Sequence, residues 1–249
     1  IRARAVAANV GPKLLFLKLM DTSVLDTEFR RQVEGWRCRS GSFRMNVALS
    51  EMPRFNGLDR VENPETALTG SINIAWSLDY LERAYDDAKR GSWSKEPVIS
   101  MNMPSLYDDS LAPPGCHVMS LFCQHFDPNL SGGKTWDDAK EEVADLIIAT
   151  VDRYAPNFKA SILGRQVLSP LDLEREFGLV GGDIFHGALH LDQLWSMRPV
   201  GGHAQYRAPV RNLYMCGSGT HPGGGVSGMP GHNAAREMIK DFKRRRLAE

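Results

Sequence analysis

The chain has 249 residues, of which 42% are hydrophobic, and its 30 basic and 30 acidic residues cancel to a formal net charge of zero. This length is sufficient to bury one large core or two smaller ones. The balanced charge argues against a general attraction to nucleic acid or to an anionic membrane. No apolar run is long enough to cross a bilayer, so we expect no integral membrane segment.

The cysteines show no C-x-x-C spacing and lie in apolar or strand-like surroundings, at Cys38, Cys116, Cys123 and Cys216. We expect buried, reduced thiols, which favours a cytoplasmic location, or the mitochondrial matrix in a eukaryote. The basic cluster at 243–246 is expected to lie at the C-terminal end of a helix, where positive charge suits the helix dipole. Peripheral membrane contact through this cluster is left open.

Strand and helix patterns alternate along the first half of the chain. The patterns predict, in order, an edge strand over 1–10, a helix over 26–34, strands over 43–49 and 71–76, a helix over 78–88, and strands over 97–103 and 117–126. The first helix is expected to end at Gly35 in a left-handed conformation.

In the second half, a capping box at 135–138 predicts the start of a long helix, whose apolar stripe continues to Tyr154. A strand over 161–167 follows, and then a helix that Ser169 caps and Gly178 ends. From residue 181 to 202 glycines become frequent and the periodicity fades, which indicates a loop-rich segment. Hairpin-like strands beside separate helices predict an α+β fold.

The most informative stretch begins with a short apolar strand at 213–216, followed by seven glycines within fifteen residues and then by a helix. Such a loop brings bare backbone N–H groups and the positive end of a helix dipole to one place, as an anionic or phosphorylated ligand requires. Pro222 disfavours the early helix start of an ordinary dinucleotide fingerprint. The alternative is a crossover that only packs a helix against a strand.

The run from 216 to 235, C-G-S-G-T-H-P-G-G-G-V-S-G-M-P-G-H-N-A-A, resembles the C-terminal flavin motif of phytoene-desaturase-like FAD-dependent oxidoreductases. Further segments resemble the same family in the same order, at 155–158, 181–187, 191–194, 198–199 and 206–209. The resemblance covers most of the chain and is dense after residue 154.

The resemblance implies a substrate domain over residues 10–207, with a mixed sheet and helices on one side of it. Residues 1–9 and 208–249 would be remnants of the FAD-binding domain, the second of them its C-terminal strand, loop and helix. No dinucleotide-binding βαβ unit is found, and the chain opens on Ile1 rather than Met. We therefore expect the C-terminal half of a longer flavoprotein, inactive by itself, with the N-terminal FAD-binding half as its missing partner.

The activity implied is transfer of a hydride from an apolar small-molecule substrate to N5 of FAD. Backbone N–H groups near Gly225 are expected to face the negative charge of the reduced flavin. The residues expected to bind the cofactor are Gly217, Ser218, Gly219, His221, Gly224, Gly225, Val226 and Ser227. The alternative is a non-catalytic binding or scaffold protein that retains the flavoprotein fold. A homo-oligomer is left open.

His186 is the candidate for lining the active-site cavity, because its segment matches the family. The spacing of His186 and His190 would place both on one face of a helix, as two ligands of a metal ion require. The sequence offers no third ligand near them, so no metal is expected. His221 is left open between a flavin contact and a structural hydrogen bond. Asp183 and Arg198 would face the cavity or form an internal ion pair or a loop cap.

Overall fold

The computed structural model describes residues 2–39 and 41–244, which form two compact units. Residues 41–172 form the first, which we call the sheet unit. Residues 2–39 and 173–244 form the second, the loop unit. Two members of the predicted basic cluster, Arg245 and Arg246, lie outside the described residues.

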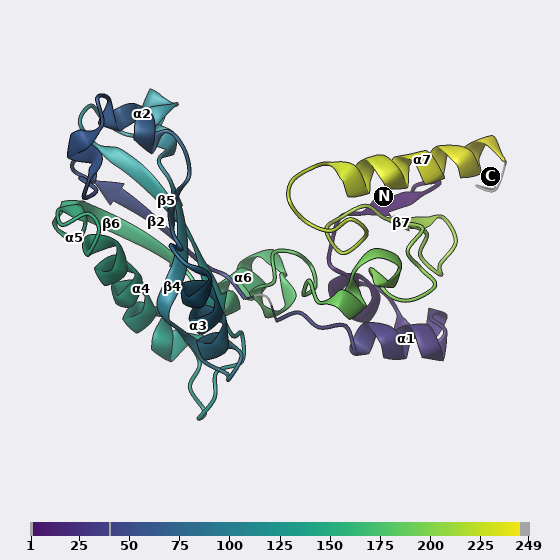
Figure 1. Cartoon of the computed structure of the whole chain (residues 1–249). Coiled ribbons are helices and arrows are strands. Elements are labelled where there is room, and N and C mark those ends of the chain that lie inside the picture. The colour runs from purple at the N-terminus through teal and green to yellow at the C-terminus, as the bar shows by residue number, and fades with distance from the viewer. Residues whose placement is uncertain (1, 40, 245–249) are drawn as a thin grey trace. The chain divides into compact units, whose positions relative to one another are not determined.

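The sheet unit is built on five antiparallel strands in the order β3-β4-β5-β2-β6 (Figure 1). The strands are β2 (Phe43–Leu49), β3 (Ile72–Ile74), β4 (Trp93–Asn102), β5 (His117–Phe126) and β6 (Ile162–Leu168). The helices are α2 (Pro64–Leu68), α3 (Leu78–Ala88), α4 (Trp136–Asp152) and α5 (Phe158–Ser161). Within the register, Met45 lies opposite Leu121 on one neighbouring strand and opposite Val167 on the other.

One face of this sheet forms the core of the unit. Alternate residues of β2, from Phe43 to Leu49, are buried and join a single apolar cluster that includes Tyr80 of α3 and Ile147 of α4. The two-residue period of the strand and the helical stripe of α4 therefore meet on the same side. The predicted capping box is confirmed, because Thr135 and Asp138 each accept a backbone N–H of the other, at 3.3 and 3.1 Å.

The loop unit has less regular structure. Strands β1 (Val6–Ala8) and β7 (Leu213–Met215) pair in parallel (Figure 1). Its other elements are a π-helix (Leu14–Leu19), α1 (Thr27–Glu34) and α7 (Met229–Lys243), together with α6 (Pro170–Phe177), in which the boundary between the two units falls. Phe16, Phe29 and Met215 belong to its small apolar core. Within the described residues, no helix combines the length and the apolar character that crossing a bilayer requires.

Three expectations need correction. The five-stranded sheet is antiparallel throughout rather than mixed, and the parallel pair β1–β7 is separate. Gly35 is not left-handed: its φ is −74°, because its N–H still bonds to the Arg31 carbonyl and continues the last turn of α1. The four cysteines are free, but only Cys123 is fully buried.

The two compact units also divide the chain at positions other than residues 10 and 207. Phe29 and Val33 of α1 pack with Ala8 and Met215, so this part of the predicted substrate domain shares a core with the predicted FAD-domain remnants. The assignment of either unit to substrate or to FAD remains a prediction.

Candidate functional site

The glycine-rich loop runs from Cys216 to Gly228, between β7 and α7, and its first half is closed on itself. The Cys216 N–H donates to the Ala8 carbonyl at 3.0 Å, which extends the β1–β7 pairing into the loop. Thr220 is fully buried and donates both its N–H and its hydroxyl to the Gly217 carbonyl, at 3.0 and 2.9 Å. The Gly223 N–H donates in turn to the Thr220 carbonyl at 2.7 Å. This half of the loop is a packed turn.

Internal packing accounts for three of the predicted cofactor glycines. A Cβ atom at Gly217 would lie 2.5 Å from Oδ1 of Asn9, and one at Gly219 would lie 2.6 Å from Cδ of Pro12. A Cβ at Gly224 would lie 2.4 Å from the ring of Phe185. These glycines are therefore required by contacts within the loop unit, whether or not a ligand binds.

The second half of the loop is open. Gly225, Val226 and Ser227 are exposed, and a Cβ at Gly225 would meet nothing within 4 Å. Gly225 and Val226 have positive φ angles of 114° and 55°. Among the described residues, the backbone N–H groups from Gly224 to Ser227 find no hydrogen-bond acceptor.

These N–H groups immediately precede α7, a helix of 15 residues whose N-cap, Gly228, contributes no side-chain cap. Unpaired donors next to a helix N-terminus favour a negatively charged ligand. The open half of the loop therefore fits the anionic part of a cofactor such as FAD. The residues that would hold it are Gly225, Val226 and Ser227. Gly217 and Gly219 pack within the loop unit, and their contact with a cofactor stays a prediction.

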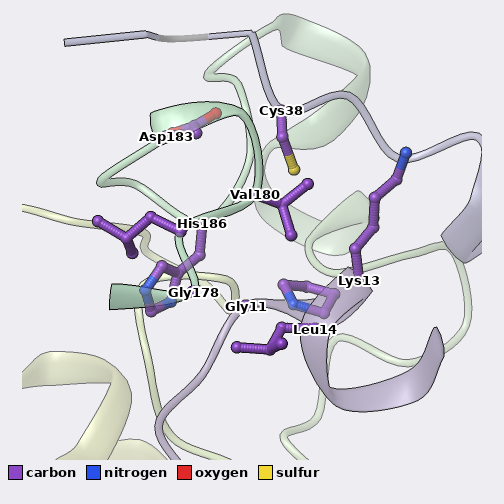
Figure 2. Close-up of a pocket in the computed structure, with 10 residues that line it drawn as sticks. Gly11, Lys13, Leu14, Cys38, Gly178, Val180, Asp183 and His186 are labelled. Carbon is purple, nitrogen blue, oxygen red and sulfur yellow. The ribbon is translucent and has the colours of Figure 1, made fainter. Parts of the chain in front are cut away.

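His186 lines a small hollow close to this loop (Figure 2). The hollow has a volume of about 10 Å³, room for about one water molecule. Its walls come from three separate segments: Gly11, Pro12, Lys13 and Leu14, then Cys38, and finally Gly178, Leu179, Val180, Asp183 and His186. A Cβ at Gly219 would lie 3.6 Å from Cβ of His186, so the packed half of the loop and the hollow are contiguous.

The backbone of His186 is tightly held. Its φ is 59°, its N–H donates to the Asp183 carbonyl at 3.0 Å, and its carbonyl accepts the indole N–H of Trp36 at 2.9 Å. The residue is not on a helix, so the predicted pairing of His186 and His190 on one helix face is wrong. No group of three metal-binding side chains occurs among the described residues.

The imidazole of His186 has a buried Nδ1 atom with no partner among the described residues. Burial, and secondarily the positive charge of Arg198, lower the pKa of His186 below its ordinary value. The side chain is therefore neutral at pH 7, and its buried Nδ1 is left without a hydrogen-bond partner among the described residues.

Cys38 faces the same hollow, and its burial raises the pKa of the thiol to about 12. It is therefore protonated at neutral pH and does not suit a nucleophilic or redox role. Asp183 is almost fully buried, and its Oδ1 accepts the N–H of Phe185 at 3.0 Å. His221 contributes its carbonyl to a 3.0 Å bond from the Tyr206 hydroxyl, which leaves the role of its side chain open.

Arg198 is the residue whose position the sequence did not reveal. It is completely buried, and its guanidinium donates to the carbonyls of Ser218, Gln193, Phe185 and Gly187. It therefore connects the turn that carries His186 to the glycine-rich loop. The Arg198–Pro199 pair is one of the segments that resemble the family in sequence, and that resemblance marked the residue without indicating its contacts.

The fold is similar to that of one solved structure. The crystal structure of an oxidoreductase from Methanosarcina mazei superimposes with a TM-score of 0.51 at 14% identity, over 97% of this chain and 43% of that one. No protein-family model matches the chain. Among curated proteins, the phytoene desaturase (lycopene-forming) of Pseudescherichia vulneris is 28% identical over 157 residues, which are 58% of this chain and 29% of that protein. One of the subunits of limonene dehydrogenase from Castellaniella defragrans is 24% identical over 97% of this chain and 45% of its own length.

The chain is a homologue of the proteins named pyridine nucleotide-disulfide oxidoreductase domain-containing protein 2. It is 42% identical to the one from Rattus norvegicus over 247 residues, which are 98% of this chain and 42% of the rat protein. The predicted resemblance to phytoene-desaturase-like oxidoreductases is thereby confirmed. The chain spans less than half the length of these relatives.

Proposed function

We propose that the chain is part of an FAD-dependent oxidoreductase and that the open half of the glycine-rich loop, residues 225–227, binds the anionic part of the cofactor. The observation that carries the proposal is the run of N–H groups without acceptors directly before α7. Relatives named as oxidoreductases and desaturases support it. When bound, FAD supplies the acceptor for a two-electron oxidation.

The residues of this chain would bind the cofactor and hold it in a fixed orientation. The N–H groups around Val226 stabilise negative charge on the cofactor, and the dipole of α7 adds to their effect. The neutral imidazole of His186 would hydrogen-bond to a water molecule, because the hollow beside it has room for about one. The packed half of the loop, anchored on Gly217 and Gly219, holds this surface in place.

For the substrate we propose an apolar, hydrocarbon-like molecule. The support is that two relatives are named for limonene and for phytoene, both of which are hydrocarbons. Anaerobic loss of the flavin absorption on addition of limonene, but not of a hydroxylated terpene, would support this substrate class. Reduction by the hydroxylated compound alone would contradict it.

The test of the site uses the protein expressed from its complete reading frame. We expect flavin absorption bands nearly stoichiometric with the chain. Gly225→Val should raise the dissociation constant for FAD at least tenfold, because a β-branched residue does not adopt a φ of 114° and the loop must change shape. Gly115→Val is the matched control, because Gly115 also has a positive φ and open surroundings but lies in the sheet unit.

Two results would contradict the proposal in different ways. Absence of flavin bands after FAD has been supplied to the wild-type protein would favour the scaffold alternative. Wild-type affinity for FAD in Gly225→Val would show that another surface holds the cofactor.

A further inference from the structure

The guanidinium of Arg198 contacts the packed half of the glycine-rich loop, and all four of its hydrogen-bond acceptors are main-chain carbonyls. The side chain is fully buried. Its Nε donates to the Ser218 carbonyl at 2.9 Å, and Nη1 donates to the Gln193 carbonyl at 3.2 Å. Nη2 donates twice, to the carbonyls of Phe185 at 2.6 Å and of Gly187 at 3.2 Å. Every one of these bonds ends at a main-chain carbonyl rather than at a carboxylate.

Three of these four carbonyls, all but that of Gln193, belong to segments without regular secondary structure. Phe185 and Gly187 flank His186, and Ser218 belongs to the packed half of the glycine-rich loop. A Cβ at Gly223 would lie 3.5 Å from Nε of Arg198, so the loop wraps closely around the guanidinium. Only arginine offers five N–H donors in a rigid fork, which explains how a single side chain serves four carbonyls.

The number of donors explains the bonds, but it does not explain why a full charge is buried there. Removing a cation from water is costly unless its charge is used or neutralised. Burial lowers the pKa of Arg198 and the negative charge of Asp183 raises it, while a guanidinium remains ionised at pH 7 in either case. The face of Trp36, 5.3 Å from Cζ, adds a further favourable contact.

We propose that Arg198 is a positioning residue for the cofactor surface: it holds Ser218 and the turn around His186 in one arrangement, and it places a positive charge behind the loop that receives the anionic cofactor. This inference rests on the proposed function. It adds a third source of positive potential, after the unpaired N–H groups of the loop and the dipole of α7.

The experiment compares Arg198→Met and Arg198→Lys with the wild-type protein expressed from its complete reading frame. The measurements are the FAD dissociation constant, the midpoint potential of the bound flavin and the far-UV circular dichroism. Arg198→Met should raise the dissociation constant at least tenfold and lower the midpoint potential, because reduced flavin is the more negative state and loses a nearby cation. Arg198→Lys should keep the wild-type potential, because the charge remains. Arg165→Met, in the sheet unit, is the matched control and should change neither quantity.

A folded Arg198→Met protein with wild-type affinity and potential would overturn the inference while leaving the proposed function intact. If Arg198→Met does not fold, the midpoint potential of Arg198→Lys tests the inference. A folded lysine variant with a lowered midpoint potential would rule out the role of charge. A wild-type protein that binds no FAD would overturn the proposed function and this inference together.

Discussion

The sheet unit and the irregular part of the loop unit are ordered by different forces. In the sheet unit, alternate apolar residues of β2 and the stripe of α4 fill one core, so burial of apolar surface determines the arrangement. Between residues 178 and 228 of the loop unit, apolar packing is sparser. There, Gln193 and Arg198 bond to main-chain groups of distant segments.

This difference shows that an irregular segment can be as closely specified as a sheet. The amide of Gln193 accepts the N–H of Arg37 at 2.8 Å and donates to the Arg37 and Ala188 carbonyls at 3.1 Å. These bonds replace the ladders that strands provide, and they satisfy buried backbone groups that would otherwise be costly. The loop that carries the candidate site is thus anchored on one side and open on the other.

The largest effect is expected in the apolar core of the sheet unit. Trp136 is buried against the rings of Phe43, Phe126 and Trp93, and its indole N–H donates to the Asp127 carbonyl. Trp136→Ala should lower the free energy of unfolding by about 3–5 kcal/mol, because it leaves a cavity. Urea titration followed by circular dichroism measures the change. The exposed Leu163→Ala is the control, and an equal loss in both variants would refute this account of the core.

Gly187→Ala tests whether the loop unit tolerates change better than the sheet unit does. The added Cβ would lie 2.3 Å from the indole nitrogen of Trp36, at a backbone φ of 143°. We expect a loss of about 1–3 kcal/mol in the free energy of unfolding and an altered near-UV signal from Trp36. Gly164→Ala, with open space around it in the sheet unit, should be nearly neutral. A neutral Gly187→Ala would mean that the irregular segment is loosely packed.

A smaller effect on stability is expected from the protonation of His186 in the loop unit. Because burial holds the pKa of His186 below its unfolded-state value, the unfolded chain takes up the proton first as pH falls below about 6.5. Stability contributed by the neutral histidine is therefore present above this pH and is lost as pH falls toward the folded-state pKa. His186→Asn, which tolerates a positive φ, should reduce the fall in urea midpoint between pH values of about 7.5 and 5.

The control for that experiment is His190→Asn, at an exposed position near His186. It serves as the reference because it removes an exposed imidazole and leaves the buried one of His186 in place. The pKa values of His125 and His203 are also lowered by burial. These two histidines will therefore contribute part of the change in urea midpoint with pH in every variant. An unchanged slope in His186→Asn would mean that the imidazole is already solvated.

The smallest effect is expected at an exposed ion pair of the sheet unit. Arg165 bonds to Asp145 at 2.6 Å, but the side chain of Asp145 is 71% exposed. Asp145→Asn should lower the free energy of unfolding by about 0.2–1 kcal/mol, and less in high salt. Thermal denaturation in about 0.05 and 0.5 M salt checks this. If Asp145→Asn lowers the free energy of unfolding more than Gly187→Ala does, the exposed ion pair would matter more than close packing, which contradicts the proposed order.

Sequence patterns predicted much of the sheet unit. The strands over 43–49 and 117–126 and the capped start of α4 are confirmed, because a two-residue period and a capping box are properties of adjacent residues. The strand, loop and helix from residue 213 were also predicted, as was the family. The predicted left-handed end at Gly35 was wrong, because helix ends depend on which backbone bonds persist.

The sequence by itself thus determined most strands and the longer helices, the glycine-rich loop and the resemblance to oxidoreductases. Only the tertiary structure decided the antiparallel strand order, the packing of Gly217 and Gly219 against Asn9 and Pro12, and the carbonyls that Arg198 serves. The physical reason is distance along the chain. Periods and caps act over a few residues, whereas the partners of a buried charge or of a close-packed glycine come from segments that meet only when the chain is folded.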